Sequence, residues 1–395
     1  MKVLQINATC GKGSTGKICQ AVSEVLFANG IDNRIAYSLG SSDYKYAFKF
    51  SDDKMIKRYS IMEHINGKMG FTAKKSTQNL ISYIEGYKPD IIHLHNIHSH
   101  DVDLELFFTY LKTTTVEIFW TFHDCWAFTG YCMYFDMVNC SAWKKQCRNC
   151  PQWRKYSMFF DKSKLLFSKK RELLFELPIT IITPSKWLAG LTKESFLERK
   201  NITVINNGID FNVFHPTKSN FREKNNLKNK IVILGVADIW NERKGLDVFI
   251  EMAKQLSGKY KIVLVGTDDD IDKQLPESII SIHRTANQKE LAQIYTAADI
   301  FVNPTREDNY PTVNMESIAC GTPVITFMTG GSPEMLNQDV GYVVEKNNID
   351  NMIDIIKKLN IKTDRTVTSC LEHAMQFNKD IAYKKYLELY LNYLS

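Results

Sequence analysis

Short apolar runs alternate with longer amphipathic stretches along the first half of the chain. Buried strands are predicted at residues 3–7, 34–38, 91–94, 116–121 and 179–183. Helical patterns lie between these runs, and the first of them covers residues 18–29. Strands separated by helices are typical of a parallel sheet covered by helices. The first half is therefore predicted to form one α/β unit.

The same alternation begins again in the second half. Strands are predicted at residues 231–236, 261–266, 300–303 and 323–327, and helices at 246–256, 289–297 and 315–320. The polar stretch 214–229, with Pro216, is typical of a linker. We therefore predict two Rossmann-like domains, residues 1–214 and 215–380, and an amphipathic helix at 381–395 that packs back on the first domain.

A ligand site is predicted from this architecture. Ligands of open α/β sheets bind beyond the carboxyl ends of the strands, so the cleft between the two domains is the expected active site.

Composition narrows the class of protein. A chain of 395 residues exceeds what one hydrophobic core usually spans. With 44% hydrophobic and 24% charged residues, it is not a disordered, collagen-like or small disulfide-stapled protein. No apolar run approaches the roughly 18–20 residues of a membrane span. The first residues fit a strand better than a signal peptide, and nine cysteines without an export signal indicate reduced thiols. A cytoplasmic protein is expected.

A glycine-rich loop follows the first predicted strand. Its sequence at residues 11–17, GKGSTGK, comes within one residue of a P-loop, but Ile18 stands where that motif needs a magnesium-binding hydroxyl. A P-loop nucleotidase is therefore not expected. Small residues before a helix expose backbone N–H groups to an anion, so phosphate contact by Gly13 and Gly16 is favoured. A plain tight turn is the alternative.

The segment 303–326 is the densest in polar chemistry. A predicted strand ends at Asn303, Asp308 lies in the following loop, and Pro311 opens a helix that carries Glu316 about one turn in. A carboxylate accepts two hydrogen bonds and so suits the vicinal hydroxyls of a sugar or ribose. The alternative is that these acids only favour the helix N-terminus.

At this point the sequence resembles a known family. The segment from Asp308 to Pro323, followed by the Gly-Gly-x-x-Glu turn at 330–334, is similar to the retaining glycosyltransferases of family 4, which have the GT-B fold. Further similar segments follow in the family's order over nearly the whole chain, at residues 120–124, 183–188, 204–210 and 243–246.

The resemblance implies a role for each matching residue. Asp308 would bind the donor sugar, Glu316 the ribose, and Lys244 with Arg243 the diphosphate leaving group. The backbone at Gly330 and Gly331 would approach the donor, with Asn309 beside it and Gly16 at the phosphate. His123 would contact the donor sugar or the acceptor. Two departures stand out: the first acid is usually Glu, so Glu307 competes with Asp308, and the usual arginine position holds Ile239.

The function implied is a hexosyltransferase. It would move a sugar from a UDP- or GDP-sugar to a glycan or lipid-linked glycan acceptor in surface polysaccharide assembly. Fixed cations and helix N-termini can stabilise the leaving diphosphate, so no catalytic metal is expected. The alternatives are a GT-B nucleotide-sugar epimerase or hydrolase and a non-catalytic nucleotide-sugar-binding protein.

Five of the nine cysteines lie in a segment, about 125–153, that resembles a family insertion. Four of them are Cys132, Cys140, Cys147 and Cys150. The last two are separated by two residues, as is typical of structural zinc ligands. Structural zinc, disulfides and free thiols are all open, with zinc favoured. Four histidines gather at residues 93–100; they are expected to line the cleft rather than to bind a metal.

Basic residues between 154 and 171 are interleaved with apolar ones, at Lys162, Lys164 and Lys169–Arg171 among others. This pattern suits a negatively charged membrane surface and predicts peripheral contact with the inner membrane face. A solvated helix face is the alternative. Part of the net charge of +6 is assigned to diphosphate binding, and no nucleic-acid partner is expected.

Overall fold

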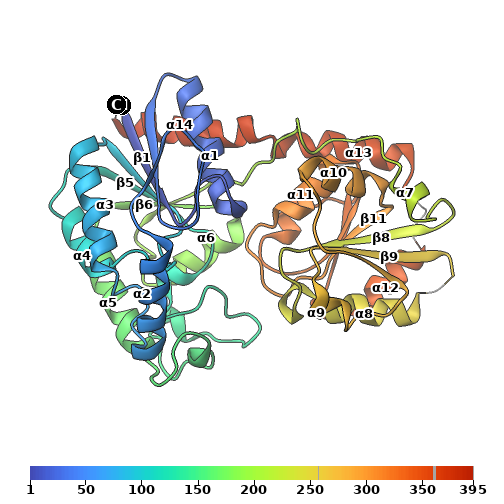
Figure 1. Cartoon of the computed structure of the whole chain (residues 1–395), viewed down its shortest axis with the longest axis horizontal. Helices are drawn as coiled ribbons and strands as arrows, with labels where there is room; N and C mark the ends of the chain where they lie inside the picture. Colours follow the sequence, from blue (N-terminus) through green and yellow to red (C-terminus); the bar gives the residue numbers. More distant parts are fainter. Residues whose placement is uncertain (257, 359–361, 395) are drawn as a thin grey trace. The chain divides into compact units, whose positions relative to one another are not determined.

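The computed structural model describes residues 1–256, 258–358 and 362–394 (Figure 1). The chain divides into two compact units. Unit 1 comprises Met1–Asn207 together with Ala382–Ser395, and unit 2 comprises Gly208–Ile381. Each unit is an α/β layer structure around one parallel sheet, as the pattern of apolar runs predicts. Among the described residues, no helix combines the length and the apolar character that crossing a membrane requires.

Unit 1 is built on a seven-stranded parallel sheet of order β3-β2-β1-β4-β5-β6-β7. Its strands are β1 (Lys2–Asn7), β2 (Asp32–Tyr37), β3 (Ala47–Lys49), β4 (Ile91–Leu94), β5 (Glu117–Thr121), β6 (Ile179–Thr183) and β7 (Asn201–Val204). The five predicted strands are present. The two that the pattern missed, β3 and β7, are the edge strands, whose half-exposed residues give no continuous apolar run.

The helices of unit 1 cover both faces of this sheet. They are α1 (Gly13–Ala28), α2 (Asp53–Asn66), α3 (Lys74–Tyr87), α4 (Leu104–Leu111), α5 (Ser163–Phe175) and α6 (Lys186–Lys193). Helix α1 begins five residues before the predicted start at Ile18, so the glycine-rich loop supplies its first turn. Between β5 and α5, at residues 122–162, the chain forms only three short 3-10 helices of three residues each.

Unit 2 repeats the design with a six-stranded parallel sheet of order β10-β9-β8-β11-β12-β13. Its strands are β8 (Ile231–Val236), β9 (Tyr260–Val265), β10 (Ile279–Ile282), β11 (Ile300–Asn303), β12 (Val324–Phe327) and β13 (Gly341–Val344). One face packs on α10 (Gln288–Ala297), α11 (Thr312–Ala319) and α13 (Asp364–Ala374), and the other on α8 (Leu246–Gln255) and α12 (Ile349–Lys358) (Figure 1). Two short helices, α7 (Phe221–Lys224) and α9 (Asp269–Asp272), complete the unit.

The segment 214–229 is not a linker. Phe214 is 3% exposed and Leu227 is 2% exposed, and both pack in the core of unit 2. Two large apolar side chains in an otherwise polar stretch are enough to hold it against the sheet, because each contributes about 1.5–3 kcal/mol on burial. The boundary between the units therefore falls after Asn207 rather than after residue 214.

The last helix, α14 (Lys379–Leu394), begins in unit 2 and enters unit 1 at Ala382. Its side chains Tyr383, Tyr386 and Tyr390 are buried against α1 and the sheet. The Tyr390 hydroxyl lies 2.6 Å from Nδ1 of His93 on β4. The tyrosines thus anchor this helix to unit 1.

Candidate functional site

Three loops of unit 2 meet at one edge of its sheet. They follow β8, β11 and β12, which are consecutive neighbours in the sheet. Since all strands are parallel, these loops leave from the same carboxyl edge. They carry Lys244, Asp308 and Gly330, so the fold gathers residues that are far apart in the sequence.

Lys244 and Asp308 form an ion pair at this edge. Lys244 Nζ lies 2.6 Å from Asp308 Oδ2, and the two side chains are only 21% and 15% exposed. The turn that presents Lys244 is held by Asn241, whose Oδ1 accepts a hydrogen bond from the Lys244 N–H at 3.1 Å. The predicted phosphate-binding lysine and the predicted sugar-binding acid are therefore direct neighbours.

The structure shows where the residues at the two departures from the family pattern lie. Arg243 donates from NH1 to the carbonyl oxygen of Glu307 at 2.9 Å, which ties its guanidinium to residues 304–311, here called the acidic loop. Glu307 as a whole is only 6% exposed, whereas its neighbour Asp308 meets Lys244. Ile239, at the usual arginine position, is 67% exposed. Of the two acids, Asp308 is the one that reaches the lysine.

Arg306 is a residue of this site that sequence reasoning missed. Its guanidinium donates to both carboxylate oxygens of Asp247, at 2.7 and 2.6 Å, and to Oδ1 of Asn347 at 2.7 Å. Such a bidentate pair is among the strongest polar contacts in proteins. Burial acts to raise the pKa of Asp247, but the guanidinium outweighs it and holds that pKa below its usual value. Arg306 thus fixes the acidic loop to the start of α8.

Glu316 lies on α11 and is oriented by a buried phenol. Its Oε2 accepts a hydrogen bond from the hydroxyl of Tyr295 on α10 at 3.2 Å. Tyr295 is fully buried, and this burial together with the nearby carboxylate raises its pKa well above the usual value. The phenol therefore stays protonated and remains a hydrogen-bond donor to Glu316.

The two-glycine turn packs directly on the acidic loop. Gly330 has φ +55°, and a Cβ at this position would lie 1.8 Å from the carbonyl oxygen of Asp308. Gly331 donates its N–H to the carbonyl oxygen of Asn309 at 2.7 Å, and Asn309 is 3% exposed. Only glycine allows this approach, which brings the two predicted donor-binding motifs together.

Unit 1 places the predicted His123 just after β5, beside residues that follow β4. His123 is partly exposed, and Nε2 lies 3.1 Å from Nδ1 of the buried His95. Burial lowers the pKa of His123 to about 4 and that of His93 to about 3. His93 is bound on both nitrogens, by Thr121 at 2.8 Å and by Tyr390. These rings are neutral hydrogen-bonding groups of the sheet edge.

The two predicted glycines of the glycine-rich loop, Gly13 and Gly16, lie in different environments. Gly13 is exposed at the first residue of α1, and a Cβ there would meet nothing within 4 Å. Gly16 is buried, and a Cβ on it would lie 2.7 Å from Oγ1 of Thr9 and 3.3 Å from the N of Gly11. In the structure Gly16 serves the close packing of the loop, whereas Gly13 leaves its backbone open to a ligand.

The four clustered cysteines line one small cavity together with Phe135 and Trp143. Sγ of Cys132 lies 3.8 Å from Sγ of Cys150, and Sγ of Cys147 accepts the N–H of Gly130 at 3.3 Å. All nine cysteines are free thiols. Within residues 1–256, 258–358 and 362–394, no three His, Cys, Asp or Glu side chains are grouped to hold a metal ion. The structural zinc site stays a prediction.

The basic stretch 154–171 does not face solvent throughout. Lys170 is only 1% exposed; its Nζ donates to the carbonyl oxygens of Trp126 and Thr129, at 2.8 and 3.1 Å, and lies 3.4 Å from the centre of the Trp126 ring. Burial lowers the pKa of this lysine to about 7. Lys170 is therefore a core residue and is removed from the predicted membrane-facing set.

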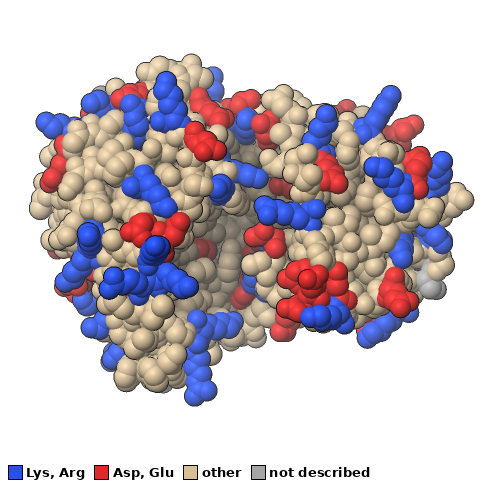
Figure 2. All heavy atoms as spheres, in the orientation of Figure 1, with Lys and Arg blue, Asp and Glu red and all other residues tan. Residues whose placement is uncertain are grey.

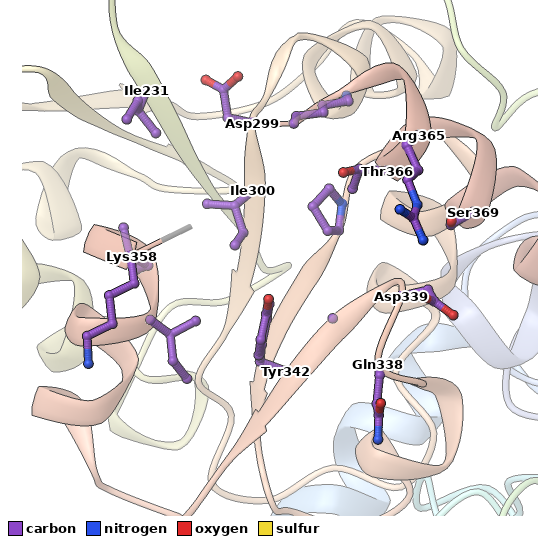
Figure 3. A pocket seen from close by; sticks show the side chains of 15 residues that line it. Ile231, Asp299, Ile300, Gln338, Asp339, Tyr342, Lys358, Arg365, Thr366 and Ser369 are labelled. Carbon is purple, nitrogen blue, oxygen red and sulfur yellow. The ribbon is translucent and has the colours of Figure 1, made fainter. Parts of the chain in front are cut away.

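A pocket of about 530 Å³ lies elsewhere in unit 2 (Figure 3). It is lined by the first residues of three strands, Ile231, Ile300 and Gly341, with Tyr342 and Arg365 at its wall. It therefore opens at the amino edge of the sheet, opposite the loops that carry Lys244 and Asp308. The predicted donor residues take no part in it.

Comparisons with known proteins indicate the family and the fold. Residues 229–360 match the family described as glycosyl transferases group 1. The putative colanic acid biosynthesis glycosyl transferase WcaC of Escherichia coli (strain K12) is 22% identical over 411 residues, covering 100% of this chain and 99% of that protein. An N-acetylgalactosaminyltransferase of Campylobacter jejuni acting on a diphospho-undecaprenol acceptor is 24% identical over 49% of this chain and 55% of its own length.

Solved structures share the fold. The sucrose-phosphate synthase of Thermosynechococcus elongatus superposes with a TM-score of 0.73 at 15% identity, over 100% of this chain and 99% of that one. Anabaena HepE in complex with UDP-glucose gives a TM-score of 0.69 at 15% identity, over 99% and 100% of the two chains. Residues 229–360 thus match the group 1 glycosyltransferase family, and the chain has the two Rossmann-like units of the GT-B fold that these solved glycosyltransferase structures share.

Proposed function

We propose that the protein is a retaining hexosyltransferase that moves a sugar from a nucleotide-sugar donor to a glycan or lipid-linked glycan acceptor in surface polysaccharide assembly. The observation that carries this proposal is the contact of Lys244 with Asp308 at the carboxyl edge of the unit 2 sheet, in the loop that leads to the helix carrying Glu316. The names of the relatives in Escherichia coli and Campylobacter jejuni support the acceptor class.

The chemistry follows from the charges in these loops. Transfer breaks the bond between the sugar C1 and the diphosphate oxygen, and the electron pair stays on that oxygen. The acceptor oxygen forms the new bond to C1, and its proton passes to the departing diphosphate oxygen. Lys244 would exchange Asp308 for the diphosphate oxygens, which leaves the Asp308 carboxylate to accept from the sugar hydroxyls. Glu316 would accept from the ribose hydroxyls. This scheme uses side-chain cations at the leaving group and no catalytic metal.

We propose a uridine nucleotide as the donor carrier. HepE, which shares the fold, was crystallised with UDP-glucose and also with UDP, which supports UDP over GDP. The residues above would contact ribose, diphosphate and sugar rather than the base. They therefore fit either nucleotide, and the choice of base has to be measured.

Thermal unfolding with a panel of nucleotides tests the proposal. UDP at about 100 times its dissociation constant should stabilise the protein by about 2.7 kcal/mol. Glu316→Ala should remove that response, measured against the unfolding temperature of the variant alone, because the change also takes the acceptor from the buried Tyr295 hydroxyl. Glu345→Ala, an exposed acid of the same unit, is the matched control and should keep the response.

The result also separates the alternatives. No stabilisation by any nucleoside diphosphate or nucleotide sugar would contradict the proposal. Stabilisation without transfer to any acceptor extract would favour a non-catalytic binding protein. Release of a free or epimerised sugar in the absence of acceptor would favour the hydrolase or epimerase.

We also propose that unit 1 contacts an anionic membrane surface. The proposed contact surface contains six apolar residues that are each about half exposed: Ile61, Met62 and Ile65 on α2 and Met158, Phe159 and Phe160 in the loop before α5. The loop is tied to α2 by a hydrogen bond from the Met158 N–H to the His64 carbonyl oxygen at 2.7 Å. Figure 2 shows Lys and Arg side chains on the surface over α2. Exposed basic neighbours are Lys57, Arg58, Lys68, Arg154 and Lys155.

Vesicle sedimentation checks this surface. The protein should pellet with vesicles that contain anionic lipid and much less with neutral vesicles, because both apolar insertion and charge contribute. Phe159→Ser with Phe160→Ser should lower the bound fraction severalfold. Phe175→Ser, on an equally exposed phenylalanine at the end of α5, is the control and should bind like the unchanged protein. Equal binding by all variants would contradict the proposal.

A further inference from the structure

The guanidinium of Arg306 joins the acidic loop to three other segments of unit 2. These are the first turn of α8, the loop after β13 and residues 241–245, here called the Lys244 turn. The acceptors are both carboxylate oxygens of Asp247, Oδ1 of Asn347 and the carbonyl oxygen of Glu242. Arg306 is only 9% exposed. Its side chain is therefore a cross-link between chain segments.

Most of the N–H groups of Arg306 are already used by the protein. A guanidinium has five of them, and in Arg306 four donate to the acceptors just named. Asp247 takes two of these hydrogen bonds, at 2.7 and 2.6 Å, and its carboxylate also balances the charge of the guanidinium. A guanidinium held in this way is poorly suited to bind a second anion. Any effect of Arg306 on an anionic ligand is therefore indirect.

The main chain of the acidic loop also contacts the Lys244 turn. The N–H of Arg306 donates to the carbonyl oxygen of Arg243 at 2.8 Å. Gly245 ends the turn with φ +77°, and a Cβ on it would lie 2.6 Å from the carbonyl oxygen of Pro304. Backbone thus lies directly against backbone, and a shift of the acidic loop would move the Lys244 turn with it.

The two partners of the ion pair described above lie on these two segments. Lys244 belongs to the turn, and Asp308 follows Arg306 by two residues in the acidic loop. A lysine ammonium sits on a flexible four-carbon stem, so its position depends on how firmly the backbone beneath it is held. Stabilisation of a leaving group requires a charge that is in place before the reaction begins.

We propose that Arg306 is a positioning residue for Lys244. It holds the Lys244 turn against the acidic loop, so that the ammonium is directed at the donor diphosphate while the guanidinium itself does not contact the donor. The effect on turnover rests on the proposed transferase function. The cross-link between the two segments does not depend on that function.

Hydrogen exchange of the protein without ligand tests the cross-link. Arg306→Lys keeps the charge but loses the bidentate pair, so backbone amides in residues 241–247 should exchange about tenfold faster. Arg222→Lys is the matched control. Arg222 also binds a carboxylate, that of Asp299 at 2.6 Å, and the carbonyl oxygen of Ala297 at 2.7 Å, but at the amino edge of the sheet. This control should leave exchange in residues 241–247 unchanged.

A second variant covers the case in which Arg306→Lys does not fold. Asp247→Asn removes one acceptor of the bidentate pair, and its side chain is 51% exposed, so the fold should tolerate the change. It should speed exchange of the same amides. Unchanged exchange in residues 241–247 of Arg306→Lys, or of Asp247→Asn where the first variant does not fold, overturns the cross-link.

A double-mutant cycle tests the role in turnover. Arg306→Lys should lower kcat about tenfold and change the donor KM less than about threefold, because a misplaced catalytic group loses transition-state stabilisation. Arg222→Lys should keep both values. In a protein that already carries Lys244→Ala, Arg306→Lys should lower kcat less than about twofold further, because residues that act through one group are not additive.

The outcomes of the cycle are distinct. An unchanged kcat in Arg306→Lys, or a loss of the same size with and without Lys244, would overturn the action of Arg306 through the lysine. Transfer by no variant, the unchanged protein included, would contradict the proposed function and with it the role in turnover. The exchange rates would then still decide whether Arg306 joins the two segments.

Discussion

Replacing Lys244 with alanine is expected to lower kcat by about 10²–10³-fold at saturating donor, with little change in the unfolding temperature. Groups that stabilise the charge developing in a transition state have effects of this size when removed. Lys244 is placed for that role because its Nζ lies 2.6 Å from Asp308, inside the loops at the carboxyl edge of unit 2. Loss of the lysine also removes the ion-pair partner of Asp308, whose Oδ1 still accepts the N–H of Asn309 at 2.9 Å.

A matched control separates charge loss from general damage. Lys254 on α8 of the same unit also forms an ion pair, with Glu251 at 3.0 Å, but its side chain is 64% exposed. Lys254→Ala should keep full turnover, because exposed ion pairs contribute about 0–1 kcal/mol. Lys244→Arg keeps the charge and should retain more activity than Lys244→Ala. Turnover near that of the unchanged protein in Lys244→Ala would rule out a leaving-group role.

The arrangement of these residues was largely predictable from sequence order. Lys244, Asp308 and Gly330 each follow a predicted strand of a repeating βα pattern. In a parallel sheet such loops share one edge, so the pattern alone places them on the same side of unit 2. The resemblance to a known family then added the roles. The ion pair between Lys244 and Asp308, 64 residues apart, is the contact that the structure adds.

Other contacts had no sequence signal because they join single polar residues over long separations. Arg306 binds Asp247 across 59 residues, and Gln5 binds His95 across 90. Neither pair has a repeated spacing or a motif. Lys170 shows the opposite failure. Its sequence neighbours are the half-buried Lys169 and the exposed Arg171, but carbonyl oxygens of the 126–130 segment and the Trp126 ring hold it in the core. A local pattern cannot report a partner 44 residues away.

Gly330→Ala is expected to destabilise the protein by about 3 kcal/mol and to lower turnover more than tenfold. A residue with a Cβ costs roughly 1–2 kcal/mol in the left-handed region, and overpacking costs typically about 1–3 kcal/mol more. Gly330 has φ +55°, and its Cβ would lie 1.8 Å from the carbonyl oxygen of Asp308. Since backbone cannot rotate away as a flexible side chain can, the acidic loop itself has to move, and with it the carboxylate that meets Lys244.

The control for Gly330 isolates the close approach from the backbone conformation. Gly258 in the same unit has φ +67°, and its Cβ would meet nothing within 4 Å. Gly258→Ala should therefore lose only about 1–2 kcal/mol of folding stability, the cost of a Cβ in the left-handed backbone region, and keep its turnover. Urea unfolding midpoints and initial transfer rates of the two variants measure both terms. Equal losses in the two variants would mean that the turn at Gly330 does not hold Asp308. A loss of turnover in Gly330→Ala alone would mean that transfer requires the position of the Asp308 carboxylate and not only its charge.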